Sequence, residues 1–168
     1  MPDPFVLKPM PISAASVPRA LERALHYRLL NAPELAESIC LDVLDVDPDN
    51  QEALVTLVLA LTDQFGVSEP SPSPAQVDDY VGRLNSEYQR HYYRGIVCER
   101  QGRAYLRRRL GPVFAFDAFR EAMDWFEKAA AIRPEGDDEA LLRWNTCVRT
   151  IHRNHLEPRA VEPDQMLE

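Results

Sequence analysis

Apolar residues recur along this chain at intervals of three and four positions, the spacing that places side chains on one face of an α-helix. Seven segments show this pattern between residues 17 and 154. We therefore predict an all-α protein in which helices cover on the order of two thirds of the residues. A chain of 168 residues is long enough for one such domain with its own core.

Two of the segments share a further internal spacing. In each, a small residue is followed by a larger apolar residue, a second small residue and a proline. These positions are Ala36, Cys40, Val43 and Pro48 in the first segment, and Ala122, Phe126, Ala129 and Pro134 in the second. Before the first set, Ala24 and Tyr27 pair a small residue with an aromatic one. This arrangement resembles the tetratricopeptide repeat, in which two antiparallel helices approach closely at small residues and a proline closes the unit.

The resemblance covers roughly residues 17 to 152 and implies a right-handed α-solenoid of antiparallel helix pairs. We expect the repeat domain to span 17–154. An extended segment over 1–16 would precede it, and a flexible tail over 155–168 would follow it.

Local signals indicate the boundaries of the first repeat. Asn31 is expected to cap its second helix, with Pro33 in the first turn and Glu34 completing a capping box. Asn50, which lies two residues after Pro48, is expected to cap the helix that follows.

The second unit follows the pattern less closely. It begins at Gln51 with a first helix that ends near Gly66, and a stiff loop rich in proline and serine covers 68–74. The second helix of this unit lacks the closing proline and rests on four apolar positions at helical spacing, Val77, Tyr80, Val81 and Leu84.

The third unit begins near Tyr88, and its Gln101-Gly102 pair resembles the turn between the two helices of the family's repeat. The chain is fifteen residues longer here than in the first unit, so residues 103–113 are either an insertion or an extension of the helix. A last helix over 137–154 resembles the capping helix that ends such arrays.

Basic residues are concentrated in the third unit, where one short stretch holds seven arginines and two acidic residues in a chain of net charge -8. Arg90 and Arg94 are four positions apart, and Arg100, Arg103 and Arg107 continue at intervals of three and four, so each set can share a helix face. Two interpretations stay open: ion pairs with acidic residues of neighbouring helices, or docking of an acidic or phosphorylated partner. The acidic chain as a whole argues against nucleic-acid binding.

By resemblance to the family, one face of each first helix lines an inner, concave surface that binds a peptide or helix of another protein. Together with the arginines, we expect this partner-binding surface to comprise Leu21, Leu25, Arg28, Val55, Leu59, Tyr92, Ile96, Arg100, Arg103, Arg107, Leu141, Asn145 and Arg149. It would be an apolar trough with basic edges. The family's carboxylate clamp places Lys and Asn at inner positions where leucines, Val55 and Ile96 stand here, so chaperone C-terminal tails are not expected as ligands.

Neither enzymatic chemistry nor a cofactor is expected. His152 and His155 form a close pair but lack the clustered partners of a metal site. The sequence has no Gly-x-Ser-x-Gly elbow and no glycine-rich phosphate loop. The three cysteines, Cys40, Cys98 and Cys147, lie far apart within apolar helical patterns, and we expect buried free thiols.

The sequence gives no sign of a membrane or secretory protein. The longest apolar stretch, 53–61, is too short for a membrane span. The first residues lack the basic start and apolar core of a secretory signal, so a cytoplasmic location is expected.

Two other functions compete with a general binding scaffold. One is a dedicated secretion-type chaperone, because small acidic proteins with three such repeats shield exported proteins in bacteria. The other is a structural subunit whose trough is filled by its own residues 5–12, a segment of alternating apolar residues and prolines.

Overall fold

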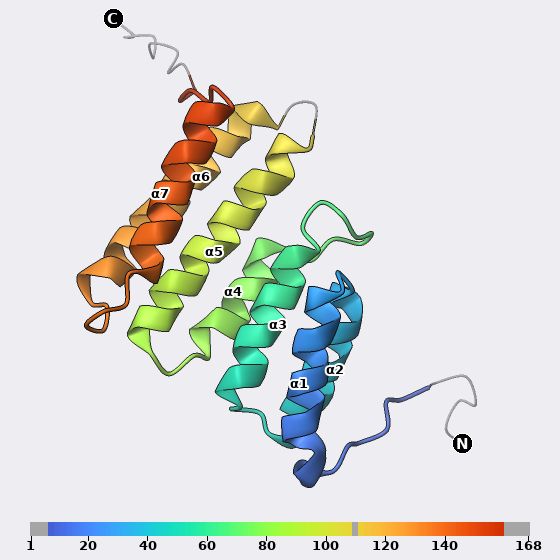
Figure 1. Cartoon of the computed structure of the whole chain (residues 1–168). Coiled ribbons are helices and arrows are strands. Elements are labelled where there is room, and N and C mark those ends of the chain that lie inside the picture. Colours follow the sequence, from blue (N-terminus) through green and yellow to red (C-terminus); the bar gives the residue numbers. More distant parts are fainter. Residues whose placement is uncertain (1–6, 109–110, 160–168) are drawn as a thin grey trace, which may run out of the picture.

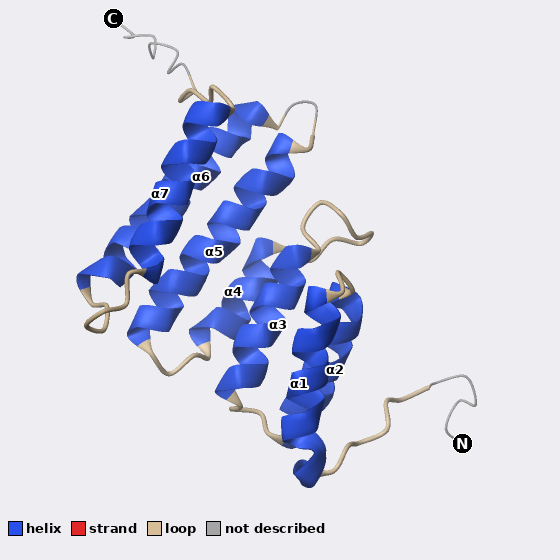
Figure 2. Cartoon of the chain, in the orientation of Figure 1, coloured by secondary structure: helices blue, strands red, loops and turns tan. Residues whose placement is uncertain are grey.

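The chain is all-α. The computed structural model describes residues 7–108 and 111–159, and within these ranges it contains seven α-helices and no strand (Figure 1 and Figure 2). A short 3-10 turn, η1 (Ala14–Ser16), precedes the first of them. The helices are α1 (Val17–Leu29), α2 (Pro33–Val46), α3 (Gln51–Asp63), α4 (Pro74–Gly82), α5 (Glu87–Leu106), α6 (Pro112–Ala131) and α7 (Glu139–Arg153).

The helices pack mainly against their neighbours in the sequence. Each helix contacts the one that follows it, and α1 with α3 and α3 with α5 are additional neighbours. Figure 1 shows the resulting succession, from the α1–α2 pair at one end to the α6–α7 pair at the other. The first, third and fifth helices are therefore held next to one another, which matters for the site below.

Side-chain caps start three of the helices. The Asn50 side chain accepts a hydrogen bond from the backbone N–H of Ala53 at 2.9 Å, as expected from the sequence. Ser73 and Ser86 cap α4 and α5 in the same way, at 3.2 Å in both cases. Each cap satisfies a backbone donor that the first helical turn leaves without an intrahelical partner.

The expected capping box of α2 is wrong. The residue that precedes the helix is Ala32, which offers no side-chain cap. Asn31 has a φ of 56°, and its N–H bonds to the carbonyl of Arg28 at 3.0 Å, while the N–H of Ala32 bonds to the carbonyl of Tyr27 at 2.9 Å. This pattern terminates α1, because asparagine tolerates the left-handed conformation that such a helix end requires.

The Gln101-Gly102 pair does not form a turn; it lies inside α5, and the extra residues of this unit extend the helix. The glycines of α5 serve close packing instead. A Cβ at Gly95 would lie 2.4 Å from the ring of Phe126, and a Cβ at Gly102 would lie 3.1 Å from the ring of Phe119. These positions let the two 20-residue helices α5 and α6 approach closely over their length.

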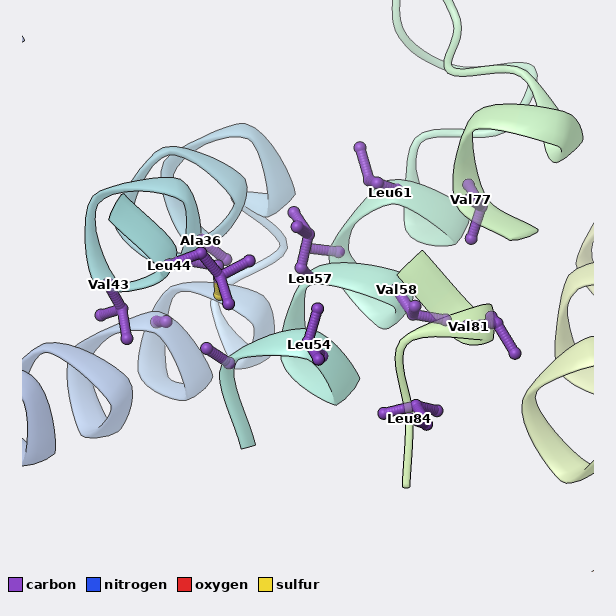
Figure 3. Close-up of a cluster of buried hydrophobic side chains, with 14 of the residues drawn as sticks. Ala36, Val43, Leu44, Leu54, Leu57, Val58, Leu61, Val77, Val81 and Leu84 are labelled. Atoms are coloured by element: carbon purple, nitrogen blue, oxygen red, sulfur yellow. The ribbon is translucent and has the colours of Figure 1, made fainter. Parts of the chain in front are cut away.

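Two clusters of buried side chains make up the core. In the first, shown in Figure 3, residues of α3 such as Leu54, Leu57 and Val58 lie between α2 and α4. The second joins α5, α6 and α7 and contains the fully buried rings of Phe119 and Phe126. The short α4 contributes Val77 and Val81, and Leu84 follows it, so the apolar positions predicted for this weak helix are buried.

The segment after α7 also contributes to the core. Leu156 is buried and packs with the second cluster, and its N–H bonds to the carbonyl of Ile151 at 3.0 Å. His155 has a φ of 50°, so it ends α7 in the same manner as Asn31 ends α1. The prediction of a flexible tail over 155–168 is therefore wrong for Leu156, its second residue, which is packed against the core. The part of this segment from 160 to 168 lies outside the described residues.

Candidate functional site

One carboxylate joins three helices of the molecule through ion pairs. Asp63, the last residue of α3, accepts a hydrogen bond from Arg28 Nε of α1 and another from Arg100 Nη1 of α5, each at 2.8 Å. The sequence placed both arginines on the partner-binding surface but did not identify the carboxylate between them. The structure brings Arg28 and Arg100 together across 72 positions of sequence.

These three side chains are partly shielded from water. The exposed fractions are 19% for Arg28, 19% for Asp63 and 28% for Arg100. Charge-assisted hydrogen bonds in such a setting are stronger than those of fully exposed surface pairs, because solvent screens them less. The contact therefore fixes α1, α3 and α5 relative to one another.

A second carboxylate lies on α5, one position before Arg100 in the sequence. Glu99 is fully buried and accepts two hydrogen bonds from Arg103, at 3.1 and 2.9 Å, on one of its oxygens. Its other oxygen faces Arg143 of α7 at 3.5 Å. Burial opposes the charge on Arg143, but the interactions with Tyr92 and Glu99 outweigh it and raise the pKa of this guanidinium above its usual range.

We call these six side chains the inner-face cluster: Arg28, Asp63, Glu99, Arg100, Arg103 and Arg143. Sequence reasoning missed both of its acids and also Arg143. A signal was present, since Asp63 ends the apolar helix that began at Gln51, and Glu99 follows an apolar run in α5. A single acid on an apolar helix is rarely buried without a basic partner.

Apolar side chains of α1, α3 and α5 adjoin the cluster at helical spacing. Leu25 lies one turn before Arg28 and is 40% exposed, while Leu59 lies one turn before Asp63 and is partly buried. Tyr92 is also partly buried and packs against Tyr88 and Tyr93.

Other residues expected on this surface contribute less to it. Val55 is partly buried beside the first core cluster. Leu21 and Ile96 are 4% and 1% exposed and belong to the core. The apolar surface of α1, α3 and α5 is therefore smaller than the sequence indicated.

The α7 residues expected on the same surface lie elsewhere. Leu141 and Asn145 line a depression between α6 and α7, and Arg149 is exposed. Arg143, only two positions from Leu141, faces α5, because two residues correspond to about 200° around a helix. Trp144 fixes how α7 is rotated about its own axis. Its ring packs against the second core cluster, and its Nε1 donates a hydrogen bond to Glu127 of α6 at 2.9 Å.

Most of the remaining arginines have partners within the chain. Arg94 pairs with Asp78 of α4 at 2.8 Å. Arg90 donates to the carbonyl oxygens of Leu84 and Asn85, and Arg107 donates to the carbonyl oxygen of Phe65. Arg94 and Arg100 therefore form the ion pairs with neighbouring helices that the first interpretation predicts. Arg90 and Arg107 instead contact backbone carbonyl oxygens, which neither interpretation included. Arg108 is exposed, and residue 109 lies outside the described part of the chain.

The N-terminal residues within the described range do not cover this surface extensively. Leu7 and Met10 are 93% and 86% exposed, and Ile12 packs against the first core cluster. Phe5 and Val6, which belong to the segment expected to compete for the trough, lie outside the described residues.

A separate groove lies on α5 between α4 and α6. Its two adjoining parts have volumes of about 300 and 290 Å³ and share Val97, Cys98 and Glu121 as lining residues. At one end Arg94 extends over the ring of Trp125, and at the other Arg159 pairs with Asp117 at 2.9 Å. The ion pairs of Arg94 with Asp78 and of Arg159 with Asp117 therefore lie at its two ends.

The cysteines are reduced, and their thiols are weak acids. Burial raises the pKa of Cys40, Cys98 and Cys147 from an ordinary 9.0 to about 12 in each case. At pH 8 we expect Cys98, the most accessible of them, to react with an aromatic disulfide reagent at least about a hundredfold more slowly in the native protein than in urea. Reaction at the unfolded rate in both solvents would contradict this environment.

The raised thiol pKa values also set the direction of an alkaline effect on stability. A thiol that is a weaker acid in the folded chain contributes its full stabilisation below the unfolded pKa of 9.0. That contribution is lost as the pH rises from 9 towards 12. Urea midpoints should therefore stay level between pH 7 and pH 8 and fall at higher pH.

Comparisons with known proteins provide no family assignment: no protein-family model matches the chain, and neither a curated protein nor a solved structure shows significant similarity to it. Within residues 7–108 and 111–159, no group of three His, Cys, Asp or Glu side chains is placed to hold a metal ion. The helices in these ranges are too short or too polar to cross a membrane.

Proposed function

We propose that this protein is a tetratricopeptide-like α-solenoid that binds a peptide or helix of another protein and performs no chemistry of its own. The binding surface is the inner face formed by α1, α3 and α5. Support comes from the contacts between these alternate helices and from the fully buried small residues Ala24, Ala36 and Ala122, which stand at the positions where the repeat pattern requires close helix approach.

The single observation that carries the proposal is the contact of Asp63 with Arg28 and Arg100. It joins the three helices of the inner face, so that Leu25, Leu59 and the two arginines belong to one preformed surface. A preformed surface binds a ligand at a lower entropic cost than one that must be ordered first. The combination of apolar side chains and partly exposed guanidinium groups is also typical of protein-binding surfaces.

The thiol chemistry is in keeping with a cytoplasmic location, which remains part of the proposal. All three cysteines are free, and two of them are fully buried. Reducing compartments preserve such thiols without a structural disulfide. A tail-binding chaperone of the clamp type is not proposed, because Leu25 and Leu59 stand on the inner face where the clamp has Lys and Asn.

Selection from a displayed library of random peptides tests this function and requires no candidate partner. We expect the wild-type protein to enrich a family of related peptides. Leu25→Asp should reduce that enrichment at least about tenfold, because it places a charge on the apolar part of the inner face. Leu35→Asp on α2 is the matched control, since Leu35 is 51% exposed, and it should leave the enrichment unchanged.

Two outcomes would count against the proposal. One is that no peptide family emerges from repeated selections with folded protein. The other is that Leu25→Asp and Leu35→Asp enrich the same peptides as the wild type, which would place the binding surface outside the inner face.

A further inference from the structure

The two arginines that hold Asp63 retain hydrogen-bonding capacity. A guanidinium carries five N–H donors on three nitrogen atoms. Among the described residues, Arg28 uses only its Nε in a hydrogen bond, and Arg100 uses only one Nη. Each arginine therefore keeps two further nitrogen atoms that can donate to a second acceptor. The side chains of Arg28 and Arg100 are 19% and 28% exposed, so an acceptor from solvent or from a partner can reach them.

The local charge is also unbalanced. Arg28 and Arg100 share one carboxylate, and Arg103 and Arg143 share another, so the inner-face cluster holds four guanidinium groups and two carboxylates. Over these six side chains the formal charge is +2, and it is +1 when Glu139, which also interacts with Arg143, is included. The protein as a whole has a net charge of -8. An anionic side chain is the ligand that this imbalance favours.

The structural role of the two arginines does not use all of their donors. Together they join α1 and α5 to α3 through one carboxylate. Each is 2.8 Å from a different oxygen of Asp63 and uses one nitrogen atom for that contact, so the same side chains can donate to a second acceptor beside this carboxylate. Arginine is preferred at sites of this type because its planar fork binds a carboxylate through two parallel hydrogen bonds.

We propose that Arg28 and Arg100 bind an aspartate or glutamate side chain of the partner, next to Asp63, and that Leu25, Leu59 and Tyr92 contact apolar residues flanking that acid. This inference rests on the proposed function and specifies its ligand as an acidic segment with neighbouring apolar residues. Asp63 has two roles in this site. It positions the two guanidinium groups, and it competes with the incoming carboxylate for their donors.

The competition gives the proposal a test in which two variants act in opposite directions. The probe is a short fluorescein-labelled peptide of glutamate, leucine and glycine, compared by fluorescence anisotropy with a counterpart that has glutamine at every glutamate position. The wild-type protein should bind the glutamate peptide about tenfold more tightly than the glutamine peptide, because a hydrogen bond to a charged group is stronger than one to a neutral amide.

Two variants should change this binding in opposite directions. Arg100→Gln should remove the preference for the glutamate peptide. Asp63→Asn should increase the affinity for the glutamate peptide several-fold, since it frees both arginines from their internal carboxylate.

Further variants separate binding from folding. Arg100→Lys keeps a positive charge that can pair with Asp63 but lacks the planar fork, so the fold should be retained and the preference for glutamate should decrease. Arg94→Gln is the matched control, because Arg94 lies on the same helix and pairs with Asp78 at a similar distance of 2.8 Å. It should leave the peptide affinities unchanged. Melting temperatures of all variants establish which are folded, and if Asp63→Asn unfolds, the Arg100 variants decide.

The inference is overturned if the wild type binds the two peptides equally, if it binds neither, or if folded Asp63→Asn and Arg100→Gln change the affinity in the same direction. Equal binding of both peptides that Leu25→Asp weakens would remove this ligand assignment while leaving the proposed function intact. Failure of the peptide-library selection would remove the proposed function itself.

Discussion

Replacing Ala122 with tryptophan should destabilise the protein by more than about 2 kcal/mol. Ala122 is fully buried at the centre of α6 and packs within the cluster that joins α5, α6 and α7. The facing helix already has glycine at positions 95 and 102, where phenylalanine rings of α6 fill the space. A large ring at position 122 therefore has no cavity to enter and must force the two helices apart.

Urea denaturation monitored by circular dichroism measures this effect. Ala131→Trp is the control, since Ala131 lies on the same helix but is exposed, and its midpoint should stay close to that of the wild type. Equal midpoints for Ala122→Trp and the wild type would mean that the packing of α5 against α6 differs from that described.

Replacing Glu99 with glutamine should cost about 2 kcal/mol of stability. The side chain is fully buried, and its charge compensates Arg103 and Arg143, which hold α5 and α7 together. Glutamine keeps the size of the residue but leaves two guanidinium groups without a counter-ion. Because these arginines are 39% and 32% exposed, water offsets part of the loss, and the cost should lie below that of a fully buried pair.

Asp78→Asn is the matched control for this prediction. It also neutralises the carboxylate of an arginine pair on α5, but the Asp78 side chain is 51% exposed. Exposed ion pairs contribute about 1 kcal/mol or less, so the midpoint should change little. If the two variants lost equal stability, burial would not explain the contribution of Glu99.

The helices themselves could be predicted from the sequence because their apolar spacing is a local signal. Even the degenerate segment that became α4 has Val77 and Val81 one turn apart, and both are buried. The small residue expected at the helix crossings was also informative, since Ala36 and Ala122 are both fully buried. These features depend on side-chain size and periodicity, which the sequence contains directly.

Features that depend on three-dimensional packing could not be predicted in the same way. The Gln101-Gly102 pair resembled a turn, because glycine favours both turns and close helix contacts and the sequence alone does not distinguish them. Asn31 was assigned to the start of α2 because asparagine serves at both ends of helices, and only the backbone conformation shows that it ends α1.

The candidate site was predicted in part. The resemblance to the repeat family placed Arg28 and Arg100 on one surface, and in the structure both contact Asp63. The resemblance could not identify Asp63 as their shared partner, because ion pairs between distant segments depend on helix rotation. The same limit applies to α7. Its apolar positions predicted a helix, yet the ring of Trp144 packs towards α6 and turns Leu141 away from α5.

The most direct test of binding at the inner face is a titration of the isotope-labelled protein with a library-selected peptide, followed by two-dimensional amide NMR. We expect the largest shifts in α1, α3 and α5 around Leu25, Leu59 and Arg100, with little change at Asp78 of α4 or Glu121 of α6. Shifts confined to Asp78, Glu121 and their neighbours would instead place the ligand in the groove between α4 and α6, and would contradict binding at the inner face.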